Sequence, residues 1–425
     1  MKPHTTMAVA AIFVCVVVAP AIFGDSAIQE IVIKNGKFSQ EWCPINVPVE
    51  KAIAPGDLQY LKCPDGTCLS VQVRPEETGS VITFILPKLE ADQTLRLVPT
   101  NTSKEEQPMQ VQKTADYRID IKAGNTLITS YCFQPDSEKP YLYPVIGPKG
   151  THLTRGFPME NLDFEKELKA QDHPHHRSFW VAYGDVNGGD FWMMGKDPNH
   201  RDAQKTDEIA VTQSGPVYGR LLARNSWVKA DGPRAVSEQR EYIFYNTPEE
   251  ARVIDSIVTF TATDGDALFG ATKEGGICSL RLNPKIDESH GNGVIRNSEG
   301  GRGAKECWAH RATWCDYYGT LDGNVVGIAV FDHPTNLRHP TWWHIREYGL
   351  FSANCFGLRD FFQLPTKSER DQPNKHVGDY LLPAGKSLTF NYRIVLHAGD
   401  TDQAQIANRY AAYGTPPQAE VVWKK

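Results

Sequence analysis

The sequence lacks the features that mark several large classes of protein. Its 425 residues carry a formal net charge of −6 and no basic stripe, which excludes a nucleic-acid-binding surface of the usual kind. A P-loop, a G-x-S-x-G elbow and an H-E-x-x-H pair are all absent, so no familiar phosphate-loop, serine-hydrolase or zincin motif is present. The paired C-x-x-C motifs that zinc knuckles favour are also missing. The chain has no low-complexity segment either.

Long apolar runs are equally scarce, and the one that exists is N-terminal. Residues 7–18 are apolar throughout and follow Lys2, which matches a secretory signal and falls short of the roughly 20 residues of a spanning helix. We expect residues 1–24 to be a signal peptide, with cleavage between Gly24 and Ala27. Cys15 lacks the usual lipobox context. The sequence therefore predicts an exported protein, periplasmic or secreted, without stable membrane insertion.

Eight of the nine cysteines follow this leader, and an even number in an exported chain permits disulfides. The stretch C-P-D-G-T-C places a turn between Cys63 and Cys68, which makes them the best candidate pair. Cys307 and Cys315 are a weaker second pair.

Helical patterns are few, and strand patterns dominate. Segments such as S-V-I-T-F-I-L and V-I-D-S-I-V-T-F-T-A are short, β-branched and bounded by turn residues, which predicts an all-β fold of stacked antiparallel sheets. The clearest helix covers residues 401–413, with Thr401 or Asp402 as its N-cap. We expect an N-terminal β lobe over residues 25–135 and a larger β-sandwich domain over 136–425.

The most distinctive segment is Q-D-H-P-H-H-R-S-F-W, residues 171–180. Histidine exchanges protons near neutral pH, so His173, His175 and His176 are candidate catalytic residues. If the segment is extended, His173 and His175 point to one side and His176 to the other. The same residues also fit a hydrogen-bonded loop whose aromatic side chains lie in the core. Neighbouring candidates for substrate binding are Arg177, Trp180, Asp185, Asn187, Asp190 and Trp192.

A second cluster of histidine, arginine and tryptophan covers residues 330–349. If W-H-I-R is a strand, His344 and Arg346 share one face and form a possible clamp for a carboxylate or hydroxyl group. His333 and Asn336 follow a strand in a loop, although D-H-P also makes an ordinary turn.

Two further segments supply polar and aromatic candidates. They are Glu274 and Arg281 within K-E-G-G-I-C-S-L-R-L, and Trp308, Arg311 and Asp316 within residues 297–319. Arg311 also fits a surface position. The glycines of the second segment do not match a dinucleotide loop. Aromatic faces pack against the C–H faces of sugar rings while polar side chains bond to hydroxyl groups, so the composition favours a saccharide ligand.

The block H-P-H-H-R-S-F-W-V-A-Y-G-D-V-N-G-G-D-F-W resembles the soluble PmoA-like family of exported bacterial proteins. Similar segments lie at 139–155, 308–319, 332–350 and 382–400, and Ser178 stands where that family has glycine. The common label "methane oxygenase" does not fit a chain without spanning helices after its leader. The resemblance implies a β-supersandwich similar to galactose mutarotase.

Mutarotases use histidine as an acid and glutamate as a base. By that resemblance, one of the three clustered histidines is the acid and Glu274 the base, although a shared fold does not establish a reaction.

Three functions remain open from the sequence. The first is a carbohydrate-active enzyme of epimerase, lyase or glycosidase type that uses histidine acid/base chemistry. The second is a metalloprotein in which His173, His175 and His176 bind a divalent metal; no cofactor is otherwise indicated. The third is a non-catalytic glycan-binding protein.

Overall fold

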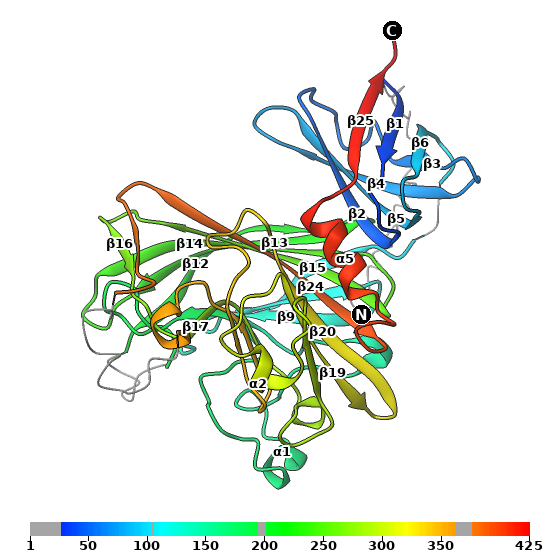
Figure 1. Cartoon of the computed structure of the whole chain (residues 1–425). Helices are drawn as coiled ribbons and strands as arrows, with labels where there is room; N and C mark the ends of the chain where they lie inside the picture. The colour runs from blue at the N-terminus through cyan, green and yellow to red at the C-terminus, as the bar shows by residue number, and fades with distance from the viewer. Residues whose placement is uncertain (1–26, 104–105, 194–200, 363–375) are drawn as a thin grey trace, which may run out of the picture.

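The computed structural model describes residues 27–103, 106–193, 201–362 and 376–425. Two bodies are visible in Figure 1: a smaller lobe that contains both ends of the described chain, and a larger two-layered part. Every strand pair in them is antiparallel, and the expected strand segments form strands. The predicted all-β class and its stacked antiparallel sheets are therefore confirmed.

The smaller lobe is built on one seven-stranded sheet, which we call the N-terminal sheet. Its spatial order is β2 (Gln40–Val49), β5 (Ser80–Leu89), β4 (Cys68–Pro75), β3 (Tyr60–Lys62), β6 (Thr94–Pro99), β1 (Ile28–Lys34) and β25 (Gln418–Trp423). The last strand of the chain thus pairs with the first (Figure 1).

The larger part contains two eight-stranded sheets. The site sheet has the order β21 (Trp343–Ile345), β22 (Leu350–Ala353), β17 (Gly275–Arg281), β11 (Phe179–Tyr183), β10 (Tyr141–Leu142), β9 (Thr126–Cys132), β8 (Arg118–Ala123) and β7 (Met109–Ala115). The long-strand sheet has the order β12 (Ala203–Gln213), β13 (Tyr218–Val228), β14 (Arg234–Tyr245), β15 (Ala251–Thr261), β24 (Ser387–Ala398), β20 (Asn324–Asp332), β19 (Trp314–Leu321) and β18 (Val294–Asn297). A small sheet pairs β16 (Ala267–Phe269) with β23 (Tyr380–Leu382).

The main hydrophobic core lies between these two eight-stranded sheets. Alternation along β11 shows how the sequence selects the faces: Phe179, Val181 and Tyr183 enter the core, whereas Trp180 and Ala182 belong to a separate cluster on the outer face. Burying one such large side chain contributes about 1.5–3 kcal/mol to folding. The period-two pattern therefore creates a packed interior and also an outer face that is free to carry polar chemistry.

The sheets divide the chain at places other than residue 135. Strands β7 to β9, between Met109 and Cys132, belong to the site sheet, and the C-terminal strand belongs to the N-terminal sheet. The N-terminal lobe has its own hydrophobic core, to which Ala412 of the C-terminal helix contributes. The expected domain limits themselves stay a prediction.

Helices are short throughout the described residues. They are α1 (Asp163–Glu167), α2 (Gly303–Cys307), α3 (Leu358–Phe361) and α5 (Ile406–Gly414), with 3-10 turns at Pro148–Gly150 and Pro284–Ile286. The predicted C-terminal helix exists, but its predicted caps are wrong, because the helix begins at Ile406. Thr401 instead donates its hydroxyl to the buried carboxylate of Asp316 (2.6 Å), so a tertiary contact takes the side chain that local sequence assigns to capping.

The predicted disulfides are also wrong. The structure records the cysteines after the leader as thiols. The Cys68 thiol donates to the carbonyl oxygen of Thr102 (3.0 Å) rather than joining Cys63. Cys307 and Cys315 are both buried thiols. The Pro-Asp-Gly turn between Cys63 and Cys68 is present, with the Cys63 N–H bonded to the Thr67 carbonyl oxygen (2.8 Å), and it needs no covalent closure.

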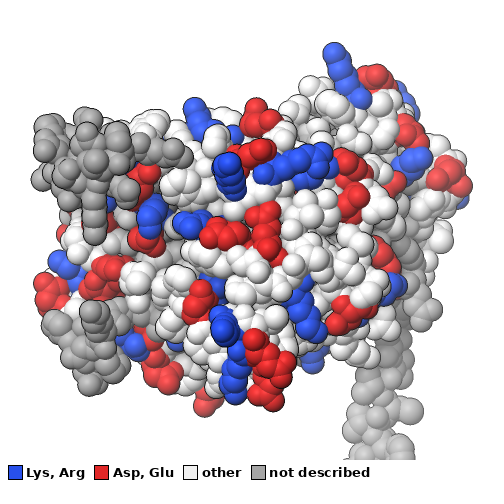
Figure 2. All heavy atoms as spheres, turned by 60° about the horizontal axis from the view of Figure 1, so that its bottom comes forward, with Lys and Arg blue, Asp and Glu red and all other residues white. Residues whose placement is uncertain are grey.

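The predicted signal peptide lies outside the described residues. Within the described part of the chain, the structure contains no helix with the length and apolar character needed to span a membrane. Figure 2 shows one face of the molecule, on which basic and acidic side chains are interspersed without a large patch of either sign.

Candidate functional site

The three clustered histidines lie on a tight turn that leads into β11. The His176 N–H donates to the His173 carbonyl oxygen (3.0 Å), and Pro174 occupies the second position of the turn, which its fixed φ favours. His173 itself has a left-handed φ of 42°. The segment is therefore a turn and not extended, and His173 and His176 lie side by side instead of on opposite faces.

A stack of four rings rises from the site sheet through this turn. Trp180 lies at the base, fully buried, with its ring centroid 5.2 Å from that of His176. His176 stacks on His173 (5.0 Å, 7° between planes), and His173 stacks on Tyr348 (5.1 Å, 8°). The His173 side chain, 40% exposed, is the open histidine of the cluster, because His175 and His176 are 5% and 1% exposed.

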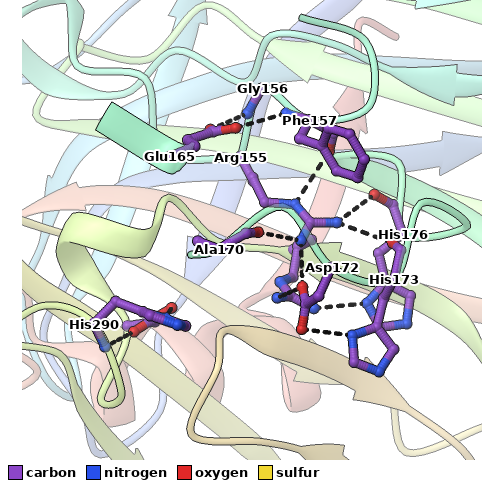
Figure 3. A network of polar contacts seen from close by, with 11 residues as sticks. Arg155, Gly156, Phe157, Glu165, Ala170, Asp172, His173, His176 and His290 are labelled. Carbon is purple, nitrogen blue, oxygen red and sulfur yellow. Dashed lines mark hydrogen bonds and ion pairs between the residues drawn. The ribbon is translucent and has the colours of Figure 1, made fainter. Parts of the chain in front are cut away.

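The carboxylate of Asp172 joins this stack to two buried arginines (Figure 3). Its Oδ1 accepts from Arg155 Nη1 (2.7 Å) and Arg281 Nη2 (2.5 Å), and its Oδ2 is 2.6 Å from His173 Nδ1. Arg281 Nη1 also lies 2.9 Å from His176 Nδ1. One carboxylate thus orients the exposed imidazole, while Arg281 orients the buried one.

Arg155 holds the loop rather than facing solvent. Its side chain is fully buried, and it donates to the carbonyl oxygens of Phe157 (3.1 Å), Ala170 (2.9 Å) and His173 (3.0 Å). Nearby, Glu165 accepts the backbone N–H groups of residues 156 and 157 (Figure 3). These bonds fix both ends of the segment that carries the histidines, so the site is preorganised by backbone contacts.

Burial and charge set the protonation of the cluster. Burial alone would raise the pKa of Asp172, but the hydrogen bond from His173 and the two guanidinium groups outweigh it and hold the pKa below its usual range. Burial lowers the pKa of His175 to about 3, with Lys139 adding to the effect. Burial and Arg281 lower the pKa of His176 well below its usual value. His175 and His176 are therefore neutral, and Asp172 is ionised, near pH 7.

His344 reaches the same outer face through the register of the site sheet. Direct cross-strand partners form one row that runs His344, Ser352, Ser279, Trp180. Trp343 and Ile345 of β21 point into the core, which leaves His344 on the outer side. Its Nδ1 is buried and has no hydrogen-bond partner among the described residues, and burial lowers the pKa of His344 to about 3.

Arg346 and Glu274 complete the polar surroundings of Tyr348. The Arg346 guanidinium lies 5.4 Å from the Tyr348 ring and 5.9 Å from the Trp308 ring. Burial raises the pKa of Tyr348, and the nearby Glu274 carboxylate raises it further. Glu274 is ion-paired with Lys273. Arg346 and Glu274, which were predicted as site residues although they are distant in sequence, therefore lie within electrostatic reach of the stack.

Other expected binding residues have structural partners. Asp185 and Asp190 accept hydrogen bonds from backbone N–H groups of their own turns, and Asn187 accepts one from β16. Trp192 is fully buried beneath the cluster. Arg177 forms an ion pair with a glutamate (3.0 Å). Trp180 and Trp192 are thus covered, and their faces cannot stack on a sugar.

The second predicted cluster, residues 330–349, and the separate candidates of residues 297–319 are divided between different parts of the sandwich. Asp316 is buried in β19, where it lies 2.9 Å from His397 Nε2. Arg311 is exposed, with its guanidinium over a tryptophan ring at 4.6 Å. His333 and Asn336 lie in the loop after β20, at the long-strand sheet. Only His344 and Arg346 of that cluster accompany the histidine stack.

The predicted metal alternative does not match the geometry. The rings of His173, His175 and His176 pack face to face or edge to face, and the Nδ1 atoms of His173 and His176 are engaged by Asp172 (2.6 Å) and the Arg281 cation (2.9 Å). In the described residues, no group of three or more His, Cys, Asp or Glu side chains is arranged to hold a metal ion.

Four contributors to the site were not singled out from the sequence: Arg155, Asp172, Tyr348 and Lys139. An aspartate directly before a histidine is a usable signal, because a carboxylate orients an imidazole. Lys139 had no such signal. It is buried, and its ammonium group donates to the carbonyl oxygens of Trp192 (2.6 Å) and His175 (3.4 Å).

Residues 118–411 match the model of a family of unknown function, DUF6807. The chain belongs to the DUF6807 family. That match covers the site sheet from β8 onward, the long-strand sheet and the residues of the histidine stack. The resemblance to the PmoA-like family stays a prediction beside it.

No curated protein matches the sequence. Among solved structures, the chain is similar to a protein in glycosyl hydrolase family 38 from Enterococcus faecalis, at 9% identity and a TM-score of 0.39. The match covers 95% of this chain and 49% of that one, so this DUF6807 member spans about half the length of that protein. A TM-score of this size assigns no function.

Proposed function

We propose that this DUF6807 protein is an exported carbohydrate-active enzyme in which His173 transfers the proton. The observation that carries the proposal is the Asp172–His173 pair, with Oδ2 and Nδ1 2.6 Å apart and the imidazole partly exposed. Among the five residues expected to be catalytic, His175, His176 and His344 are buried with lowered pKa values, which suits them to positioning rather than proton exchange.

The pair has the polarity that acid/base chemistry requires. The ionised Asp172 accepts the Nδ1–H of His173, so the lone pair of the neutral ring is on Nε2. When Nε2 takes a proton from a substrate, the adjacent carboxylate stabilises the imidazolium, and the proton can be returned in the next step. The two arginines keep Asp172 ionised throughout and prevent it from taking the proton itself.

The groups around His173 favour a polyhydroxylated substrate. The His173 ring, whose two faces lie against His176 and Tyr348, offers its edge at the surface, the Arg346 guanidinium lies 5.4 Å from the Tyr348 ring, and the Glu274 carboxylate is within electrostatic reach of Tyr348. We assign Glu274 as the second acid/base group, opposite in role to His173. The buried tryptophans speak against a purely aromatic glycan-binding module.

The test follows saccharides by proton NMR, because one method separates the three reaction types. Epimerisation exchanges signals between isomers, elimination creates a vinyl proton, and hydrolysis creates new anomeric protons. The probes are neutral and uronate-containing mono- and oligosaccharides. We expect turnover of at least one probe by the wild type and a loss of about 100-fold or more in His173→Asn. Asparagine tolerates the left-handed backbone of this position but cannot cycle a proton.

His376→Ala is the matched control. His376 also faces a carboxylate, with its Nδ1 2.7 Å from Asp379 Oδ2, but its side chain is 68% exposed. We expect wild-type turnover from this variant. Equal turnover by His173→Asn and the wild type would refute the assignment of His173.

A further inference from the structure

A second concave site lies between the N-terminal lobe and the long-strand sheet. It is a cavity of about 440 Å³ bounded by β2, β15, β24, α5 and the segment that leads into β25. Figure 1 shows α5 between the lobe and the larger part of the molecule. Neighbours of its lining residues on β24, Phe390, Tyr392 and Ile394, point into the main core. The cavity therefore lies on the outer face opposite the one that carries the histidine stack.

The charged groups of this cavity neutralise each other. Arg393 forms a bidentate pair with Asp255, with Nε to Oδ1 at 2.7 Å and Nη2 to Oδ2 at 2.8 Å. Tyr245 donates its hydroxyl to the same carboxylate (3.0 Å), and the Tyr413 ring covers the guanidinium at 4.6 Å. A charged ligand would find no unpaired counter-charge among these groups.

Neutral hydrogen-bonding groups of the same cavity have capacity to spare. The backbone of Asn391 exchanges hydrogen bonds with the side chain of Asn336. The side-chain amide of Asn391 has no hydrogen-bond partner among the described residues. His333 uses Nδ1 toward Thr335 (2.8 Å), which leaves Nε2. Burial and the Arg393 charge lower the pKa of His333, so its ring is neutral near pH 7. The Tyr413 hydroxyl also has no partner in the described part of the chain.

Asn46 also lines the cavity, and its side chain bonds to Thr83 (2.8 Å) and Tyr245 (3.5 Å). The remaining lining is apolar and largely rigid, and it consists of Pro44, Pro48, Pro416, Pro417, Ile45, Ile257, Ala412 and Ala419. Proline rings cannot donate backbone hydrogen bonds and present flat C–H surfaces. The cavity thus combines rigid apolar walls with an amide, an imidazole nitrogen and a phenol, and its volume is within the range of small-ligand sites.

We infer that this cavity binds a neutral saccharide of one or two rings. The C–H face of a sugar packs on the proline walls, and its hydroxyl groups bond to Asn391, His333 and Tyr413. The paired Arg393 and Asp255 reject uronates and amino sugars, which would bring an uncompensated charge into the cavity. The site is separate from His173 and carries no acid/base pair of its own, so it binds without transforming its ligand.

The experiment is saturation-transfer NMR on the full chain with glucose, galactose and N-acetylglucosamine as neutral probes and glucuronate and glucosamine as charged probes. We expect a neutral probe to give a signal that titrates, and the charged probes to give none that competes with it. Asn391→Ala and His333→Ala should each weaken binding about tenfold. Thr389→Ala is the matched control, because Thr389 occupies the neighbouring outward position of β24 outside the cavity.

His173→Asn separates this inference from the proposed function. Binding that survives His173→Asn and falls in Asn391→Ala supports the cavity, whatever the outcome for turnover. Binding that disappears in His173→Asn and persists in Asn391→Ala assigns the ligand to the histidine stack and overturns the inference. Equal binding of neutral and charged probes, equal loss in Thr389→Ala, or no neutral probe bound by a folded wild type also overturns it.

Discussion

The charge of Asp172 should matter for stability as well as for chemistry. In Asp172→Asn, Arg155 and Arg281 lose their common counter-charge, and their side chains are 0% and 1% exposed. Removing one partner of a fully buried pair costs about 3–5 kcal/mol. The Asp172 side chain is 37% exposed, so solvent screens part of this, and we expect about 2–3 kcal/mol. By calorimetry, the unfolding transition should fall by about 3 °C at pH 7, given the large unfolding entropy of a chain of 425 residues.

The pH dependence gives the sign of the effect. The folded-state pKa of Asp172 lies below its unfolded value, so the stability it contributes is fully present above that unfolded value, about 4. As the pH falls toward the folded-state pKa, the unfolded chain binds the proton first and the contribution is lost. The difference between wild type and Asp172→Asn should therefore shrink from pH 7 to pH 3.

Asp264→Asn is the control for this measurement. Asp264 forms a bidentate pair with Arg234, but the two side chains are 47% and 39% exposed. We expect this variant to cost much less stability than Asp172→Asn, because solvent screens an exposed pair. If Asp172→Asn costs no more than Asp264→Asn at pH 7, or if its cost is the same at pH 3, the reasoning about buried guanidinium groups is wrong.

Three further predictions concern other parts of the fold. Ser178 has a left-handed φ of 56°, and its hydroxyl donates to Thr154 Oγ1 (2.7 Å). Ser178→Gly loses this hydrogen bond but relieves the backbone strain, whereas Ser178→Ala loses the bond and keeps the strain. We expect the glycine variant to have the higher melting temperature of the two. Iodoacetamide should label Cys63 and Cys68 in the folded protein, with Cys63 reacting faster as the pH rises because burial raises its pKa to about 11; a peptide joining the two would contradict this. Arg240→Met leaves the buried carboxylate of Glu238 without its counter-charge and should lower the free energy of unfolding, measured by urea denaturation, by about 3–5 kcal/mol. An unchanged free energy of unfolding would contradict this prediction.

Local patterns predict the strands well and their partners poorly. The segment that forms β15 is predicted as a strand from its own residues, because successive side chains of a strand point to opposite faces whatever the rest of the chain does. The pairing of β1 with β25 joins the two ends of the described chain, and no short window contains that information. Competition explains the misplaced helix start as well: the Thr401 hydroxyl has a better acceptor in the buried Asp316 carboxylate than in its own helix.

The histidine cluster shows the same limit at the level of the site. Its residue types and its loop position followed from the sequence, but the directions of the side chains depended on one turn. Pro174 permits both an extended segment and a turn, and Arg155, which lies 18 residues earlier in the chain, favours the turn by binding the carbonyl oxygen of His173. The sequence did not indicate that Asp172 bridges His173 and the arginines, because this contact depends on Arg281, which lies 109 residues away in the chain.

The sheet topology places His333 and His344 in different parts of the fold, although they belong to one cluster in the sequence. Strand β20 of the long-strand sheet ends at Asp332, and β21 of the site sheet begins at Trp343, so residues 333–342 pass from one layer of the sandwich to the other. His333 stays with the first layer and lines the cavity beside α5, whereas His344 joins the row that contains Trp180. A connection of this length is enough to place similar residues on opposite outer faces. The site that we propose at His173 and the cavity that we propose to bind a neutral saccharide therefore lie on opposite outer faces.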